Sequence, residues 1–123
     1  MEFEPLSNKI IGAAIEVHKI LGPGMLESAY EECLSYELVQ QGLSIERQKP
    51  IPILYKQIKL DCGYRIDLLI EKKIIIELKS VDALAPIHEA QILTYLHFAG
   101  IKTGLLINFN VTLLRSGIRR YVL

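Results

Sequence analysis

The sequence has no tryptophan, two cysteines and no excess of charge of either sign. Cys33 and Cys62 stand alone without a CxxC spacing, so neither a disulfide framework nor a thiolate zinc site is expected, and a reduced cytoplasmic setting is the simplest interpretation. No apolar run approaches the roughly 18 residues of a membrane span, and Glu2 and Glu4 differ from the basic start of a signal peptide. We therefore expect a soluble cytoplasmic protein without membrane contact.

The balanced charge also bears on nucleic-acid binding. Lysine plus arginine and aspartate plus glutamate number 14 each. Binding to nucleic acid draws most of its affinity from basic residues that neutralise phosphates, so the overall charge gives such a function little support. Two local groups of basic residues are present. One lies near the C-terminus and consists of Arg115, Arg119 and Arg120; the other follows the early predicted strands and consists of Lys49, Lys56 and Lys59.

The chain has 123 residues, half of them hydrophobic, and we expect one domain spanning residues 1–123. Apolar periodicity and glycine or proline boundaries predict three helices, over residues 7–21, 25–41 and 86–99. Apolar runs predict strands, over residues 43–49, 51–60, 63–70, 74–79, 103–109 and 118–122. This order predicts an α/β (mixed α+β) fold with a central mixed sheet flanked by helices.

Three charged residues interrupt the two most apolar strands. Asp67 lies in the first strand of a predicted hairpin, and Glu77 and Lys79 lie in the second. Burying such charges without partners costs roughly several kcal/mol each, which favours their gathering around a neutralising group. Glu77 and Lys79 are two residues apart and share a face, and Asp67 is expected opposite Glu77 on the neighbouring strand. Two carboxylates beside a lysine suit a divalent metal and its water.

A purely structural interpretation of the same residues remains open. Asp67 and Lys79 could form a buried ion pair, and Glu77 could cap a strand end at the surface. The pattern of an aspartate followed by Glu-x-Lys is short and has chance matches.

These residues carry a resemblance to a known family. Asp67 followed by Glu77-Leu78-Lys79 resembles the core motif of the PD-(D/E)XK nuclease superfamily, and Gly63 and the segment 91–95 are similar to flanking motifs of its RecB-like branch. Residues 22–30, which read GPGMLESAY, resemble the small proteins called the GxxExxxY family, although only two residues separate Glu27 from Tyr30. The resemblance implies a restriction-endonuclease-like core.

The resemblance also implies roles for site residues. Asp67, Glu77 and the backbone carbonyl of Leu78 would hold Mg²⁺ or Mn²⁺, whose preferred ligands are oxygens. Lys79 would position or deprotonate the attacking water, or stabilise charge in the transition state. Glu27 would add a third acidic group that reaches the metal or its water. The alternative for Glu27 is a favourable interaction with the helix dipole, typically worth about 1 kcal/mol or less.

Three further residues are candidates for supporting roles. Tyr30 is expected in the core or as a hydrogen-bond partner for Glu27. Gln91 and Tyr95 are four residues apart on the third predicted helix, so they face the same way. Because Ile87, Leu93 and Leu96 suggest an extensively buried helix, Gln91 is expected to find a phosphate, a metal-bound water or a backbone group. A solvated position is the alternative for Gln91.

The leading functional hypothesis is a magnesium-dependent nuclease that hydrolyses phosphodiester bonds in DNA or RNA. A rival hypothesis is a non-catalytic module of the same fold that binds nucleic acid or a protein partner, including a second copy. Phosphoryl chemistry on a free nucleotide is a third. The neutral charge favours the rival, whereas the intact set of Asp67, Glu77 and Lys79 favours the enzyme.

Overall fold

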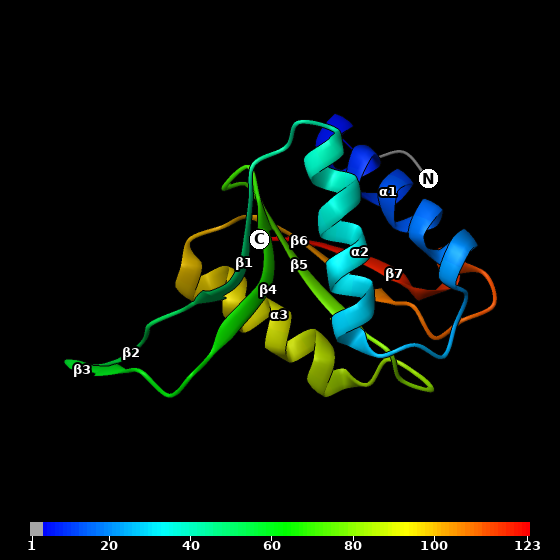
Figure 1. Ribbon diagram of the computed structural model, residues 1–123. Coiled ribbons are helices and arrows are strands. Elements are labelled where there is room, and N and C mark those ends of the chain that lie inside the picture. Colours follow the sequence, from blue (N-terminus) through cyan, green and yellow to red (C-terminus); the bar gives the residue numbers. More distant parts are fainter. Residues whose placement is uncertain (1–3) are drawn as a thin grey trace.

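The computed structural model describes residues 4–123, so Glu2 lies outside the described residues (Figure 1). The elements, in chain order, are α1 (Pro5–Leu21), α2 (Glu27–Gln40), β1 (Ile45–Pro50), β2 (Ile53–Tyr55), β3 (Ile58–Leu60), β4 (Arg65–Ile70), β5 (Ile74–Lys79), α3 (Pro86–Ala99), β6 (Thr103–Asn108), the 3-10 helix η1 (Leu114–Gly117) and β7 (Ile118–Val122). Between residues 4 and 123, no helix has the length and apolar content needed to cross a membrane.

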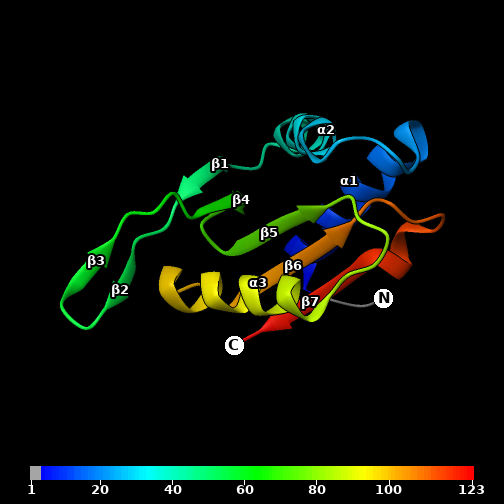
Figure 2. The same cartoon turned by 90° about the horizontal axis from the view of Figure 1, so that it is seen from below.

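Five strands form one mixed sheet in the order β1-β4-β5-β6-β7. Strands β5 and β6 run parallel, with α3 as the connection between them, and the other neighbours are antiparallel. Helices α1 and α2 cover one face of the sheet and α3 covers the other (Figures 1 and 2). The predicted mixed sheet flanked by helices is confirmed.

The core has one apolar layer on each side of the sheet. Side chains of α1 and α2, such as Ile10 and Leu34, pack with Ile76 of β5 on one side. On the other side, Ile92 of α3 packs with Ile75, the residue before Ile76 in β5. Central strands buried on both faces explain the continuous isoleucine run of β5. Each fully buried isoleucine or leucine contributes roughly 1.5–3 kcal/mol.

Proline and glycine set the helix boundaries much as the sequence predicts. Pro5 and Pro86 occupy first-turn positions of α1 and α3, where a missing amide hydrogen leaves no hydrogen bond unmade. Gly22 ends α1 with φ 69°, and Gly100 ends α3 in the left-handed conformation with φ 68°.

The predicted single strand over residues 51–60 is wrong. This segment holds a separate two-stranded sheet in which β2 pairs with β3, and Ile53 faces Leu60. Lys56 turns the chain with φ 54°, a left-handed conformation that breaks an extended strand. The resulting hairpin projects from the body of the protein (Figure 2).

Burial of two helices differs from what apolar periodicity predicts. The periodicity places Leu26 in the buried stripe of the second predicted helix, but it is 76% exposed, because it precedes the first helical residue of α2. Ile87 is 70% exposed. It is nine residues before the buried Leu96, which at 3.6 residues per turn is roughly half a turn away around the helix. Helix α3 is therefore buried along one face, which includes Ile92 and Tyr95, and not throughout.

Candidate active site

The hairpin of β4 and β5 brings the acidic residues together. Its register pairs Leu68 with Ile76 and Ile70 with Ile74. The turn between the strands uses Glu71 and Lys72, both with positive φ. The register leaves Asp67 and Glu77 beside each other at the open end of the hairpin, in the arrangement that the sequence predicts.

At Asp67 the backbone ladder of this hairpin gives way to side-chain hydrogen bonds. The Asp67 amide donates to Glu77 Oε2 over 2.8 Å, and the Leu78 amide donates to Asp67 Oδ2 over 2.8 Å. Each carboxylate therefore replaces a backbone carbonyl of the opposite strand as the acceptor. This exchange fixes both acidic side chains between β4 and β5.

The surroundings of the two carboxylates favour their protonated forms. Burial, together with the negative charge of Asp67, raises the pKa of Glu77 to about 8. Burial also raises the pKa of Asp67, although hydrogen bonds from the Leu78 amide and Gln48 oppose it. Because two ionised carboxylates in a buried site repel each other, a cation held by both would remove the conflict.

Lys79 lies beside the acidic pair, on the face of the sheet that α3 covers. Its Nζ donates to Gln91 Oε1 over 3.4 Å, and Gln91 Nε2 donates to the Tyr95 hydroxyl over 3.0 Å. Gln91 is thus not simply solvated, because it links the lysine to α3. Burial is the main cause that raises the pKa of Tyr95, and the charge of Glu77 adds to it.

The structural alternative for these residues does not match the geometry. Within the described residues 4–123, Asp67 and Lys79 form no ion pair, and the Lys79 charge acts on both carboxylates only from longer range. Glu77 is 3% exposed, so it does not cap a strand end at the surface.

A cavity of about 380 Å³ opens beside Asp67 and is lined by Glu27, Ser28, Glu31, Gln48, Asp67 and Leu78. Glu27 is the first residue of α2 and is exposed at the rim of this cavity. The cavity therefore places Glu27 on the same side of the protein as Asp67, and its role toward a metal stays a prediction.

Sequence reasoning missed three residues of this cavity, namely Ser28, Glu31 and Gln48. Gln48 Nε2 donates to Glu31 Oε1 over 2.6 Å and to Asp67 Oδ1 over 3.3 Å, so it joins the two acids. Glu31 also pairs with Arg47 over 3.1 Å. The spacing of Glu31, four residues after Glu27 on one helix, was a usable signal. Gln48 carried no such signal, because its contacts depend on its own left-handed backbone conformation within β1, with φ 50°.

Tyr30 belongs to the core and holds the loop before Glu27. Its ring is fully buried and stacks on Phe109 at a centroid distance of 4.3 Å. Its hydroxyl donates to the Gly22 carbonyl over 2.5 Å and accepts from the Met25 amide over 3.1 Å. Tyr30 thus supports Glu27 through the loop backbone, which differs from the direct hydrogen bond that we considered.

The donor set is suited to a hard divalent cation. Asp67, Glu77 and the Leu78 carbonyl offer oxygen atoms only, and a cation would remove the repulsion within the buried acidic pair. In the part of the chain that the structure describes, no three His, Cys, Asp or Glu side chains gather as a group that could hold a metal. Glu27 therefore does not complete a three-acid set in this conformation.

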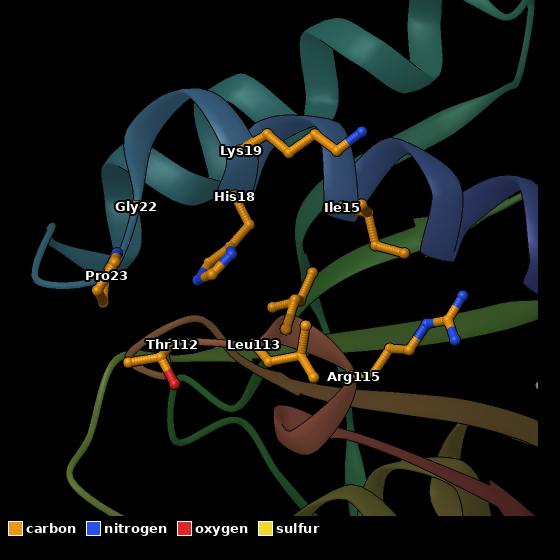
Figure 3. A pocket seen from close by; sticks show the side chains of 9 residues that line it. Ile15, His18, Lys19, Gly22, Pro23, Thr112, Leu113 and Arg115 are labelled. Atoms are coloured by element: carbon orange, nitrogen blue, oxygen red, sulfur yellow. The ribbon is translucent and has the colours of Figure 1, made fainter.

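The basic residues near the C-terminus do not form one patch. Arg119 and Arg120 are consecutive in β7, so their side chains leave opposite faces of the strand. Arg120 pairs with Glu4, whereas Arg115 lies in η1 and lines a different cavity, shown in Figure 3. Among the early lysines, Lys49 pairs with Glu46 over 2.7 Å.

A mixed five-stranded sheet between helices, with two carboxylates and a lysine on adjacent strands, is consistent with a restriction-endonuclease-like protein. The family model described as the PD-(D/E)XK nuclease superfamily matches residues 4–121, and the chain belongs to this superfamily. No curated protein and no solved structure gives a significant match. Membership points to nuclease activity and contact with nucleic acid, and such nucleases typically use divalent metals.

Proposed function

We propose that this protein is a metal-dependent nuclease that hydrolyses phosphodiester bonds in DNA or RNA. The observation that carries the proposal is the exchange of hydrogen bonds between Asp67 and the strand of Glu77, with Lys79 two residues further along. Membership in the superfamily supports the same conclusion. We further propose that residues 1–123 act as one domain, that the chain is a GxxExxxY protein, and that it works in the cytoplasm.

Mg²⁺ or Mn²⁺ is the proposed cofactor, held by Asp67, Glu77 and the Leu78 carbonyl, with Glu27 approaching it directly or through water. When bound, such a cation polarises the scissile phosphate and makes a bound water more acidic. The absence of imidazole and thiolate from the donor set supports selectivity for these ions over Zn²⁺.

The other proposed roles belong to residues of β5 and α3. The Lys79 ammonium acts on the attacking water or stabilises charge that develops on the phosphate. Gln91 positions the lysine, because its carbonyl accepts from Nζ while its amide is fixed by the Tyr95 hydroxyl. Tyr95 is a support residue, since its buried ring keeps the glutamine in place.

A substrate panel tests this proposal. Purified protein is incubated with single-stranded DNA, duplex DNA and single-stranded RNA, each with Mg²⁺, Mn²⁺ or EDTA, beside an Asp67→Asn control. Metal-dependent cleavage of one class by the wild type, absent in Asp67→Asn, is the expected result. The overall net charge of zero favours an accessory module as the second candidate. Binding of nucleic acid or of a protein partner, a second copy included, without cleavage under any metal would favour that candidate.

A further inference from the structure

A cavity of about 610 Å³ lies between α1 and the segment that follows β6, apart from the acidic residues (Figure 3). One wall is the last part of α1 and the loop after it. The other is formed by residues 112–115, and none of the nine lining residues is acidic. A cavity of this volume is large enough for a nucleotide-sized ligand.

The charged side chains of this cavity are basic. Lys19 on α1 and Arg115 in η1 are exposed, and neither forms an ion pair with any residue from 4 to 123. His18 between them donates from Nε2 to the Val111 carbonyl over 2.7 Å, which ties the two walls together. The two cations, which have no ion-pair partner among residues 4–123, lie at opposite edges of the opening (Figure 3), a placement that suits the phosphates of a strand crossing it.

The remaining lining is mostly apolar. Ile15 projects from α1, Pro23 comes from the loop after it, and Leu113 comes from the opposite wall and is 63% exposed (Figure 3). Apolar surface beside cations matches the two parts of a nucleotide, a base with apolar faces and a charged phosphate.

The loop from Gly22 to Leu26 and the start of α2 lie between this cavity and the acidic site. Pro23 lines the basic cavity, and Met25 lines a cavity of about 360 Å³ that also includes Glu27, Ser28 and Ser80. Glu27 and Ser28 line the cavity of Asp67 as well. Hydrogen bonds hold the loop at Gly22 and Met25. The Tyr30 hydroxyl bonds the Gly22 carbonyl and the Met25 amide, and the Ser80 hydroxyl donates to the Met25 carbonyl over 2.7 Å. The residues that line these three cavities therefore follow one another along the chain from the basic cavity to the cavity of Asp67.

We propose that the basic cavity binds one nucleotide of the substrate strand, to one side of the bond that is cut at Asp67 and Glu77. Lys19 and Arg115, at opposite edges of the opening, attract the phosphates on the two sides of that nucleotide, and the apolar lining receives its base or sugar. This inference rests on the proposed nuclease function. Lys19 and Arg115 would supply phosphate contacts that the neutral overall charge of the protein does not provide.

A charge-matched comparison tests the inference. Lys19→Gln with Arg115→Gln removes the two cations of the cavity, and Lys9→Gln with Lys102→Gln removes two exposed cations elsewhere. Binding of fluorescent single strands, DNA and RNA in separate arms, is measured in EDTA at several salt concentrations. One set of strands has about 12 nucleotides, enough to span a typical single-strand site, and a second set has two.

For the longer strand, the cavity variant should lose about tenfold in affinity, and its salt slope should fall by about 1 to 2, whereas the control variant changes little. The dinucleotide is long enough to fill the cavity, so it too should bind the cavity variant more weakly than the wild type or the control variant. Wild-type binding or cleavage of the longer strand together with an unchanged cavity variant, or an equal loss in the control, would overturn the cavity inference and leave the nuclease proposal standing. A wild type that neither binds nor cleaves any strand would overturn both. Melting temperatures check folding, and the single variants Lys19→Gln and Arg115→Gln replace the pair if it is unstable.

Discussion

The Asp67 amide donates a hydrogen bond to Oε2 of Glu77 over 2.8 Å, and the pair stands where the backbone ladder between β4 and β5 stops. The bond carries the Glu77 carboxylate into a buried position beside a second acid. A buried pair of this kind is unfavourable as long as both members are ionised, which supports the proposal that a cation completes the site.

Glu77 should make the metal-free protein less stable as pH rises. Its pKa of about 8 in the folded state lies above the ordinary 4.5, so between these values the folded chain holds a proton that the unfolded chain has released. The free energy of unfolding therefore falls between pH 4.5 and 8, by a few kcal/mol in order of magnitude. Urea unfolding in EDTA at pH 5 and pH 8 measures this slope.

Glu77→Gln is the matched control for that slope. The amide oxygen can still accept from Asp67, but the titrating group is gone, so most of the pH dependence should disappear. An unchanged slope in this variant would assign the effect to another group.

Lys79→Ala should abolish cleavage and spare metal binding, because the lysine acts on the water or the transition state and does not ligate the ion. Lys73→Ala, in the exposed turn of the same hairpin, is the control and should keep wild-type activity. Turnover at saturating Mg²⁺ and calorimetric affinity are measured for both variants. Wild-type turnover in Lys79→Ala would exclude the proposed role.

Glu27→Gln separates two interpretations of the first residue of α2. As a helix-start charge, Glu27 should matter by at most about 1 kcal/mol for folding and not at all for chemistry. As part of the acidic cluster, its neutralisation should leave the metal-free protein equally or more stable and lower metal affinity or turnover. We expect the second outcome, measured by melting with and without Mg²⁺. A variant that is destabilised without metal, yet keeps the full Mg²⁺-induced rise in melting temperature and full activity, would make Glu27 structural.

Tyr30→Phe should loosen the loop that precedes Glu27. The stacking on Phe109 is kept, but the Gly22 carbonyl and the Met25 amide lose their partner, which destabilises the protein by roughly 1–3 kcal/mol. Activity should fall at temperatures where the variant is still folded. Tyr36→Phe, an exposed position on the same helix, serves as the control. Equal stability of the two variants would show that the hydroxyl does not hold the loop.

The sequence was most informative where one local rule decided the outcome. The hairpin register places Asp67 opposite Glu77 once the turn near Lys72 is recognised, and the helical period places Gln91 beside Tyr95. In both cases the partners lie close in sequence, so little depends on how distant elements pack.

Contacts between distant elements could not be predicted in this way. Gln48 reaches both Glu31 and Asp67 only because β1 bends at φ 50° while α2 lies over it. The basic cavity likewise depends on α1 meeting the segment after β6. The hydrogen bond that joins them links His18 to Val111, which are 93 residues apart in the sequence. Such approaches are fixed by the packing of helices on the sheet and leave no periodic signal in the sequence.

Calorimetric titration of Mg²⁺ at pH 7 tests the acidic pair most directly. Because Glu77 is mostly protonated at this pH without a cation, metal binding should displace up to about one proton, which makes the heat depend on the ionisation enthalpy of the buffer. The wild type should bind with buffer-dependent heat, with or without a single-stranded oligonucleotide, and Asp67→Asn should bind weakly or not at all. Absence of binding by the wild type under both conditions, or equal binding by Asp67→Asn, would show that Asp67 and Glu77 do not form a metal site.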